Sequence, residues 1–236
     1  MYRFCQLPFH FDVTRLQTDL TRANDQVWLP HFVKANYDGN WSAIPLRSVG
    51  GRIDHIFSDA SVPPEGYADT QVLERCTYFR EILRAFCCPV TSVRLLKLTA
   101  GSAIKEHRDL DLSFGRGTVR LHIPISTNPQ VEFYIESERV TMGEGECWYI
   151  DATLPHRLAN HGDSDRVHIV FDCIVNDWLK NHFEQSGYLP RQLDFFETRG
   201  IRREHAAQVI EALRAMGTPT SLRHAQELQT ACAAEQ

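Results

Sequence analysis

A run of short strand-like segments between residues 92 and 175 constrains the fold of this chain more than any other feature. The segments are rich in β-branched and aromatic residues, often alternate between apolar and polar positions, and are separated by turn sequences such as AGS, GRG, TNP and GEG. They cover residues 92–99, 118–127, 131–137, 138–142, 147–152, 156–160 and 166–175. Many short strands with regular turn signals, and no interleaved helices, predict a mainly β fold built as an antiparallel sandwich or barrel.

Helix-like segments flank this run on both sides. Residues 13–24 have the pattern of a short amphipathic helix, and residues 69–86 carry apolar side chains at helical spacing behind a capping residue, Asp69. Residues 38–67 are rich in Gly, Pro, Asp and Ser, which predicts irregular, partly packed loops. Helical patterns return after residue 176.

These patterns divide the chain into two parts. We expect a β domain with N-terminal helices over residues 1–178, and a helical C-terminal extension over residues 179–236. A total of 236 residues suits one domain with an appendage.

Composition excludes several classes of protein. A formal net charge of −5 gives no basic field for nucleic acid or for an acidic membrane surface. The seven cysteines are odd in number and include no CxxC pair, which predicts reduced, mostly buried thiols. The N-terminus lacks the layout of a signal peptide, and no apolar run approaches the roughly 20 residues of a membrane span. We therefore expect a soluble cytoplasmic protein that binds neither nucleic acid nor membranes.

The stretch EHRDLDL, residues 106–112, holds the pair of side chains that says most about chemistry. Residues i and i+2 of a strand point to the same face, so His107 and Asp109 project together while Arg108 points to the other side. An HxD pair alone is common on protein surfaces. Here a second histidine, His156, follows a later strand and can complete the set from a neighbouring strand.

Two histidines and one carboxylate supply three ligands on one face of an octahedral metal and leave three positions open. A chelating cosubstrate can take two of these positions, and O₂ can take the third. Nitrogen and oxygen ligands without a thiolate suit Fe(II) better than a structural zinc ion. The sequence therefore predicts an iron site formed by His107, Asp109 and His156.

Three more polar residues lie on strands around this set. Arg166 lies in the strand after His156, where an arginine can form a bidentate pair with the far end of a dicarboxylate. Arg120 and His122 share one face of a strand and can add donors to a carboxylate-binding pocket near the metal. Each alone also suits a solvated strand face, so the prediction depends on their combination on successive strands.

Four stretches together resemble the aspartyl/asparaginyl β-hydroxylase family, which belongs to the Fe(II)- and 2-oxoglutarate-dependent oxygenases. They are EHRDLDL, RLHIPISTN, GEGECWYIDATLPHRLANHG and RVHIVFD, within residues 92–178. Upstream, YDGNWSAIPLRSVGG is similar to the corresponding part of the bacterial proline hydroxylases in that family. The resemblance implies a double-stranded β-helix, that is, a cupin-like jelly roll with flanking helices and a small C-terminal helical tail.

The resemblance also assigns roles to residues. His107, Asp109 and His156 match the iron ligands, and Arg166 matches the arginine that pairs with the 5-carboxylate of 2-oxoglutarate. The retained aspartate is typical of the bacterial amino-acid hydroxylases of the family. Leu96 stands where those members have a serine that contacts the same carboxylate, so that one contact does not carry over.

Arg120 and His122 match an Arg-X-His pair that helps to hold the cosubstrate. The family implies Fe(II), 2-oxoglutarate and O₂ as cofactor and cosubstrates. The implied reaction hydroxylates an unactivated C–H bond of an amino acid or of an aminoacyl or peptidyl residue, with succinate and CO₂ as coproducts. In such a reaction the protein's task is mainly placement of the substrate.

Candidate substrate residues lie in the 38–55 segment and around the metal strand. Trp41 can form the wall of a pocket, Arg47 can grip a substrate carboxylate, and Arg108 and Arg116 flank the metal strand. Several arginines near one mouth suit a free amino acid or an acidic side chain. Nothing in the sequence selects a free amino acid over a peptide-bound or carrier-bound one.

Two other functions stay open on the sequence alone. A non-catalytic jelly roll that binds a small acid would keep the fold, although it has no need of all three metal ligands. An oxygenase with the same iron ligands can also desaturate, cyclise or epimerise its substrate. The apolar stripes of the C-terminal helices allow three roles as well: docking on the jelly roll, covering the substrate as a lid, or forming a homodimer.

Overall fold

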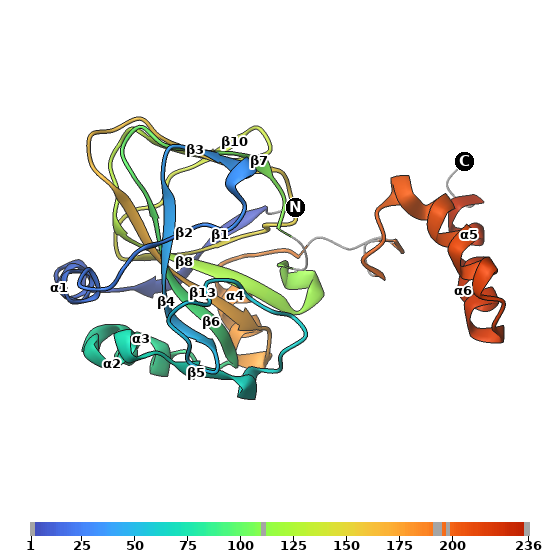
Figure 1. Ribbon diagram of the computed structural model, residues 1–236, viewed down its shortest axis with the longest axis horizontal. Helices are drawn as coiled ribbons and strands as arrows, with labels where there is room; N and C mark the ends of the chain where they lie inside the picture. The colour runs from blue at the N-terminus through green and yellow to red at the C-terminus, as the bar shows by residue number, and fades with distance from the viewer. Residues whose placement is uncertain (1–2, 110–111, 191–194, 197–198, 234–236) are drawn as a thin grey trace. The chain divides into compact units, whose positions relative to one another are not determined.

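The computed structural model describes residues 3–109, 112–190, 195–196 and 199–233 and divides the chain into two compact units, residues 1–190 and 191–236. The first unit contains the strands of the described chain, and the second is helical (Figure 1). We expected the division after residue 178. It falls after residue 190, because helix α4 (Asp177–Gln185) packs against the first strand of the jelly roll.

The strands and helices of the first unit follow one another in this order. They are β1 (Phe4–His10), α1 (Val13–Ala23), β2 (Leu29–Pro30), β3 (Tyr37–Asp38), β4 (Trp41–Val49), β5 (Tyr67–Asp69), α2 (Gln71–Arg75), α3 (Thr77–Ala85), β6 (Val90–Leu98), β7 (Ala103–His107), β8 (Thr118–Ser126), β9 (Val131–Ile135), β10 (Glu138–Val140), β11 (Glu146–Ile150), β12 (His156–Asn160), β13 (Arg166–Ile174) and α4.

Two antiparallel sheets form the jelly roll. The larger sheet has the order β1-β11-β8-β13-β6-β4-β2, with β5 paired to β4, and the smaller sheet has the order β10-β9-β12-β7-β3. Between β6 and β13 the chain passes back and forth between the two sheets, which is the winding of a double-stranded β-helix. The predicted mainly β jelly roll with flanking helices is therefore confirmed.

Apolar and polar side chains alternate along the strands of the larger sheet, so its two faces differ in polarity. On β8, Val119, Leu121 and Ile123 join an apolar core on one face, so Arg120 and His122 point to the other, toward the smaller sheet. The strands β6 and β13 alternate in the same way. Period-two patterning thus places polar side chains in the interior of the jelly roll and apolar ones under the helices.

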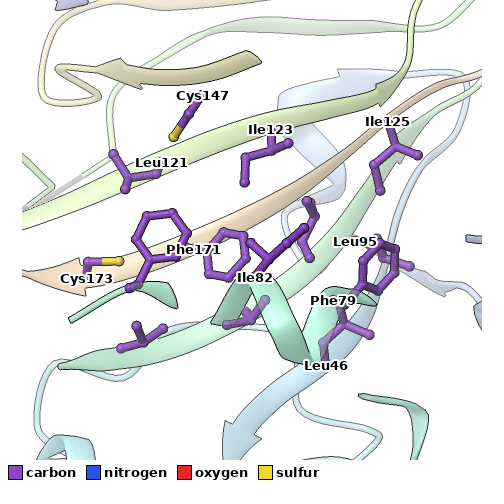
Figure 2. Close-up of a cluster of buried hydrophobic side chains, with 14 of the residues drawn as sticks. Leu46, Phe79, Ile82, Leu95, Leu121, Ile123, Ile125, Cys147, Phe171 and Cys173 are labelled. Atoms are coloured by element: carbon purple, nitrogen blue, oxygen red, sulfur yellow. The ribbon is translucent and has the colours of Figure 1, made fainter. Parts of the chain in front are cut away.

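The apolar face of the larger sheet is covered by helices. Phe79 and Ile82 of α3 lie over Leu95 and Phe171 of the sheet (Figure 2). Helices α1, α2 and α3 lie together at one side of the jelly roll (Figure 1). A second apolar cluster, which includes Leu98, Phe133 and Leu158, lies between the two sheets and joins them.

Three segments differ from the sequence-based expectation. Residues 41–49, expected to be part of an irregular loop, form the nine-residue strand β4, which is almost wholly buried against β6. The helix expected over 69–86 is broken at Cys76 into α2 and α3, with Thr70 rather than Asp69 as the first cap. The strand expected to carry both His107 and Asp109 ends at His107, so β7 covers Ala103–His107 and Asp109 lies beyond its end.

The second unit contains two helices, α5 (Ala206–Met216) and α6 (Pro219–Ala233), which pack on each other. Gly217 ends α5 in the left-handed conformation and allows the chain to reverse. A small apolar cluster, built around Phe196, Ala206 and Leu228, holds the pair together. The predicted helical character of this region is therefore confirmed for its described residues.

Candidate metal centre and substrate cavity

The three predicted metal ligands lie together where β7 and β12 run side by side. His107 ends β7, and the strand register pairs it with His156, the first residue of β12. The backbone N–H of Asp109 donates to the carbonyl of Ala152 at 2.8 Å, which holds Asp109 beside the segment that joins β11 to β12. One ligand atom of each side chain lies within 4.8 Å of the other two. The fold thus brings together residues that are far apart in sequence.

Both imidazole rings are held by a backbone carbonyl two residues earlier in the chain. Nδ1 of His107 lies 2.8 Å from the carbonyl oxygen of Lys105, and Nδ1 of His156 lies 3.0 Å from that of Leu154. Because a carbonyl can only accept, each Nδ1 carries the proton and each Nε2 keeps a free lone pair. Metal-binding histidines are usually fixed in this way.

The charge states also suit a metal. Burial lowers the pKa of His156, and the neighbouring His107 lowers it further, so this imidazole is neutral at physiological pH. Burial alone would raise the pKa of Asp109, but Arg120 and the two histidines together hold it below its usual value. Two imidazole nitrogens and one carboxylate therefore face a common point, which is the donor set that fits Fe(II).

Arg120 also points into the interior of the jelly roll, and its guanidinium donates hydrogen bonds to two carboxylates of the protein. Its Nη1 donates to Oδ2 of Asp109 at 2.5 Å, while its Nε and Nη2 donate to the two carboxylate oxygens of Asp172 at 2.7 and 3.0 Å. These contacts hold the guanidinium beside the metal ligands rather than leaving it free for a ligand.

Arg166, the first residue of β13, is a buried cation of a different kind. Its only hydrogen bond among the described residues joins Nη2 to Nδ1 of His168 at 2.9 Å, and its Nε has no partner there. No carboxylate of the described chain lies within ion-pair distance of it. Burial lowers the pKa of Arg166 to about 9. The guanidinium is therefore still charged at neutral pH and lacks a counter-charge.

His122 faces the same narrow cavity as Arg166 and the three metal ligands. Both of its ring nitrogens are buried and have no hydrogen-bond partner in the described part of the chain. Burial lowers its pKa far below the usual value, with further lowering by Arg166, so the ring is neutral. Buried polar groups are almost always satisfied, which makes His122 a ready partner for a ligand.

His107 and Asp109 also line a larger cavity of about 670 Å³. Trp41 lines it and stacks on His31, with ring centroids 3.5 Å apart, and also lies 6.2 Å from the ring of His107. Phe32 and Phe57 meet edge to face at the mouth and are exposed. The volume lies in the range of roughly 300–1,000 Å³ that is usual for small-molecule sites.

The other arginines singled out in the sequence fall in different places. Arg108 lines the larger cavity, and its Nη1 donates to the carbonyl of Thr153 at 2.8 Å. Arg47 points away from it, because its donors contact Val90, Tyr67 and the carboxylate of Asp69. Arg116 ends the short turn before β8 and does not line either cavity.

Sequence reasoning missed several residues around these cavities. His31, Phe32 and Phe57 lie in segments without a regular pattern, so no signal distinguished them. Arg94 and Asp172 did carry one, because each is a charged residue with an apolar residue directly before and after it in its strand. That pattern is typical of a buried polar network.

Comparison with known proteins places this site in context. The family described as aspartyl/asparaginyl beta-hydroxylase matches residues 11–175. Over 168 residues the chain is 28% identical to an L-proline cis-4-hydroxylase of Rhizobium meliloti strain 1021, a match that covers 69% of this chain. The match spans 57% of the length of that curated relative.

Matching solved structures are more distant. A 2OG-Fe(II) oxygenase family oxidoreductase from Burkholderia pseudomallei is 12% identical, with a TM-score of 0.47 over 73% of this chain and 85% of that one. HygX from Streptomyces hygroscopicus, solved with nickel and 2-oxoglutarate, is 11% identical, with a TM-score of 0.46 over 74% of this chain and 84% of that one.

One further property concerns membranes. Among the described helices, none combines the length and the apolar character needed to cross a bilayer.

Proposed function

The chain belongs to the aspartyl/asparaginyl β-hydroxylase family, and on this premise we propose that it is an Fe(II)- and 2-oxoglutarate-dependent oxygenase. It hydroxylates an unactivated C–H bond of an amino acid or of an aminoacyl or peptidyl residue. The observation that carries the proposal is the set of His107, Asp109 and His156, whose ligand atoms lie within 4.8 Å of one another.

These three residues would hold the metal on one face. Nε2 of each histidine is free because Nδ1 is used by a backbone carbonyl, and Asp109 is ionised. When bound, Fe(II) together with 2-oxoglutarate and O₂ supplies the oxidant for C–H cleavage, with succinate and CO₂ as coproducts. The protein fixes the ligands in advance, so little reorganisation is needed when the metal binds.

Arg166 and His122 would hold the cosubstrate. Arg166 is a buried cation without a counter-charge in the described chain, and a carboxylate would supply one. His122 offers a neutral ring with two unsatisfied nitrogens in the same cavity. A dicarboxylic acid that spans from the metal to Arg166 matches this pair of features.

The substrate would occupy the larger cavity. Its aromatic walls can exclude water from the reacting C–H bond, and Arg108 at its edge provides a positive charge. The curated relative acts on L-proline, so free L-proline and prolyl peptides are the first substrates to test.

The test is an anaerobic titration of Fe(II) and 2-oxoglutarate followed by visible absorbance. We expect a weak metal-to-ligand charge-transfer band that requires both components and is lost in Asp109→Ala. Asp163→Ala, which removes an exposed carboxylate from the turn before β13, serves as the control and should keep the band. A folded wild-type protein that gives no band, yet binds 2-oxoglutarate without metal, would favour a non-catalytic acid-binding module.

Arg166→Met gives a second prediction. Loss of the buried cation should weaken 2-oxoglutarate binding by about 30-fold or more, because truncating one partner of a buried charge pair costs about 2–5 kcal/mol. In the absence of ligand the same change should leave thermal stability equal or higher, because it removes an uncompensated buried charge. A calorimetric 2-oxoglutarate titration and a thermal melt measure the two effects. Lower stability with unchanged affinity would contradict the assignment.

A further inference from the structure

Asp172 lies in the middle of a row of charges that the sheet register creates. It belongs to β13, which runs between β8 and β6 in the larger sheet. Arg120 on β8 is its direct cross-strand partner, and Arg94 on β6 lies opposite Val170, two residues away on the same face. The strand pairing alone therefore places a carboxylate between two guanidinium groups.

The contacts within this row leave Asp172 fully occupied. It is 0% exposed and accepts hydrogen bonds from Nε and Nη2 of Arg120 and, at 2.8 Å, from Nη2 of Arg94. Burial alone would raise the pKa of Asp172, but the two arginines hold it below its usual value. Arg94 is anchored in turn, because its Nη1 donates to the carbonyl of Ile56 at 2.8 Å.

The far end of the row reaches the metal centre. Arg120 uses its remaining terminal nitrogen, Nη1, to donate to Oδ2 of Asp109. The other carboxylate oxygen, Oδ1, lies 3.7 Å from Nε2 of His107, on the side where the ligand atoms converge. One oxygen of Asp109 is therefore held by the protein, and the other is left for the metal.

We propose that Asp172 is a positioning residue for the metal centre: acting through Arg120, and braced by Arg94, it fixes Asp109 so that a single carboxylate oxygen faces the metal. The inference rests on the proposed metal site and adds a function for Asp172 and Arg94, two buried residues outside the set of metal ligands. Arg120 then has a carboxylate of the protein on each side, Asp172 and Asp109. Because Asp172 fixes two of the three donor positions of Arg120, the direction of the third is set as well.

The test uses Co(II) as a spectroscopic probe of the metal ligands in the full-length apo protein. Asp172→Asn keeps the shape of the side chain but removes its charge and one acceptor. We expect a rise of about 10–100-fold in the dissociation constant for Co(II), the usual effect of losing a group that orients a metal ligand. We also expect the Co(II) ligand-field bands to shift in position and intensity, because Asp109 can then turn and use both oxygens.

A matched control separates positioning from general loss of stability. Asp19 is also a buried carboxylate, 1% exposed, with an arginine partner in Arg22 and two backbone N–H donors from Tyr78 and Phe79. It belongs to α1, contacts the start of α3, and lines neither of the cavities beside the metal ligands. Asp19→Asn should lower the melting temperature yet leave the Co(II) affinity and spectrum of the wild type.

If Asp172→Asn does not fold, Arg94→Lys is the second variant for the same Co(II) measurement. Lysine keeps the positive charge but lacks the two terminal nitrogens through which Arg94 contacts both Ile56 and Asp172. We therefore expect a smaller change of the same kind in the Co(II) spectrum. The inference is overturned if the folded variant binds Co(II) with wild-type affinity and spectrum, or if Asp19→Asn produces the same change. A wild type that binds neither Co(II) nor Fe(II) would instead contradict the proposed function itself.

Discussion

Arg120 and Arg166 lie in the same interior, yet their surroundings give them different tasks. Arg120 contacts two carboxylates of the protein, Asp109 and Asp172. Arg166 contacts a neutral histidine and has no carboxylate partner among the described residues. At the scale of the single residue, an arginine whose charge is already balanced organises the site, whereas an arginine with an unbalanced charge is ready to bind an anion.

His31, on the wall of the larger cavity, provides a residue-scale prediction about pH. Burial, with help from Arg94, lowers its pKa from the usual 6.5 to about 4. Between these values the unfolded chain takes up a proton that the folded protein does not. The free energy of unfolding should therefore fall as the pH is lowered through this window.

His31→Phe should reduce the pH dependence of the free energy of unfolding by up to the equivalent of one bound proton. The phenyl ring keeps an aromatic group stacked on Trp41. Urea unfolding of the apo protein at several pH values between 4.5 and 7 measures the slope. His161→Phe, at an exposed turn, is the control for loss of a histidine. Equal slopes for wild type and His31→Phe would show that His31 does not contribute.

At the scale of secondary-structure elements, the turns around β11 fix how the jelly roll closes. Gly145, in the turn before β11, has a φ of +79°, and a Cβ built there would lie 2.4 Å from the carbonyl oxygen of Phe11. The same turn accepts a hydrogen bond from the N–H of Phe11 at 2.7 Å. The loop that joins β1 to α1 is therefore packed directly against this glycine.

Gly145→Ala should lower the free energy of unfolding more than Gly117→Ala does, by about 1–3 kcal/mol, the usual cost of overpacking. Gly117 has almost the same φ, +80°, but nothing lies within 4 Å of a Cβ built on it. The pair thus separates steric overlap from the cost of the left-handed conformation. Urea denaturation of the two variants gives the difference, and equal losses would mean that the Phe11 contact can relax freely.

At the scale of the whole molecule, the site belongs to one unit. The metal ligands, Arg166 and the residues that line the two cavities all lie within residues 1–190. A chain that ends at residue 190 should therefore fold and keep the charge-transfer band of the full-length protein. The helices of residues 191–236 remain candidates for a lid or a homodimer contact.

The truncated chain can be compared with the full-length one by the same anaerobic titration and by analytical ultracentrifugation. An unchanged band together with a loss of dimers would favour the homodimer role. An unchanged band with faster release of 2-oxoglutarate would favour the lid. Loss of the band in a folded truncated protein would show that the metal centre needs the second unit.

Sequence patterns predicted the type of fold, and they singled out the three side chains that the fold brings together as candidate metal ligands. Period-two alternation and regular turns indicate antiparallel strands, and the i, i+2 spacing of His107 and Asp109 predicted both side chains on one face. Their ligand atoms do converge, although β7 ends at His107. The sequence failed at β4, where Gly- and Pro-rich neighbours on both sides masked a strand that is buried against β6. It also failed at Cys76, where the helix is interrupted and Asp19 from α1 binds the freed N–H groups of α3.

The sequence by itself therefore determined the kinds of donor in the site and the faces from which they project, because these follow from local backbone geometry. Only the tertiary structure decided which charges meet. The sequence predicted that Arg120 helps to hold the cosubstrate, and the register of β8, β13 and β6 adds that it lies between Asp172 and Asp109. Pairing between distant strands is set by packing and hydrogen bonding across the whole sheet, and no local pattern encodes it.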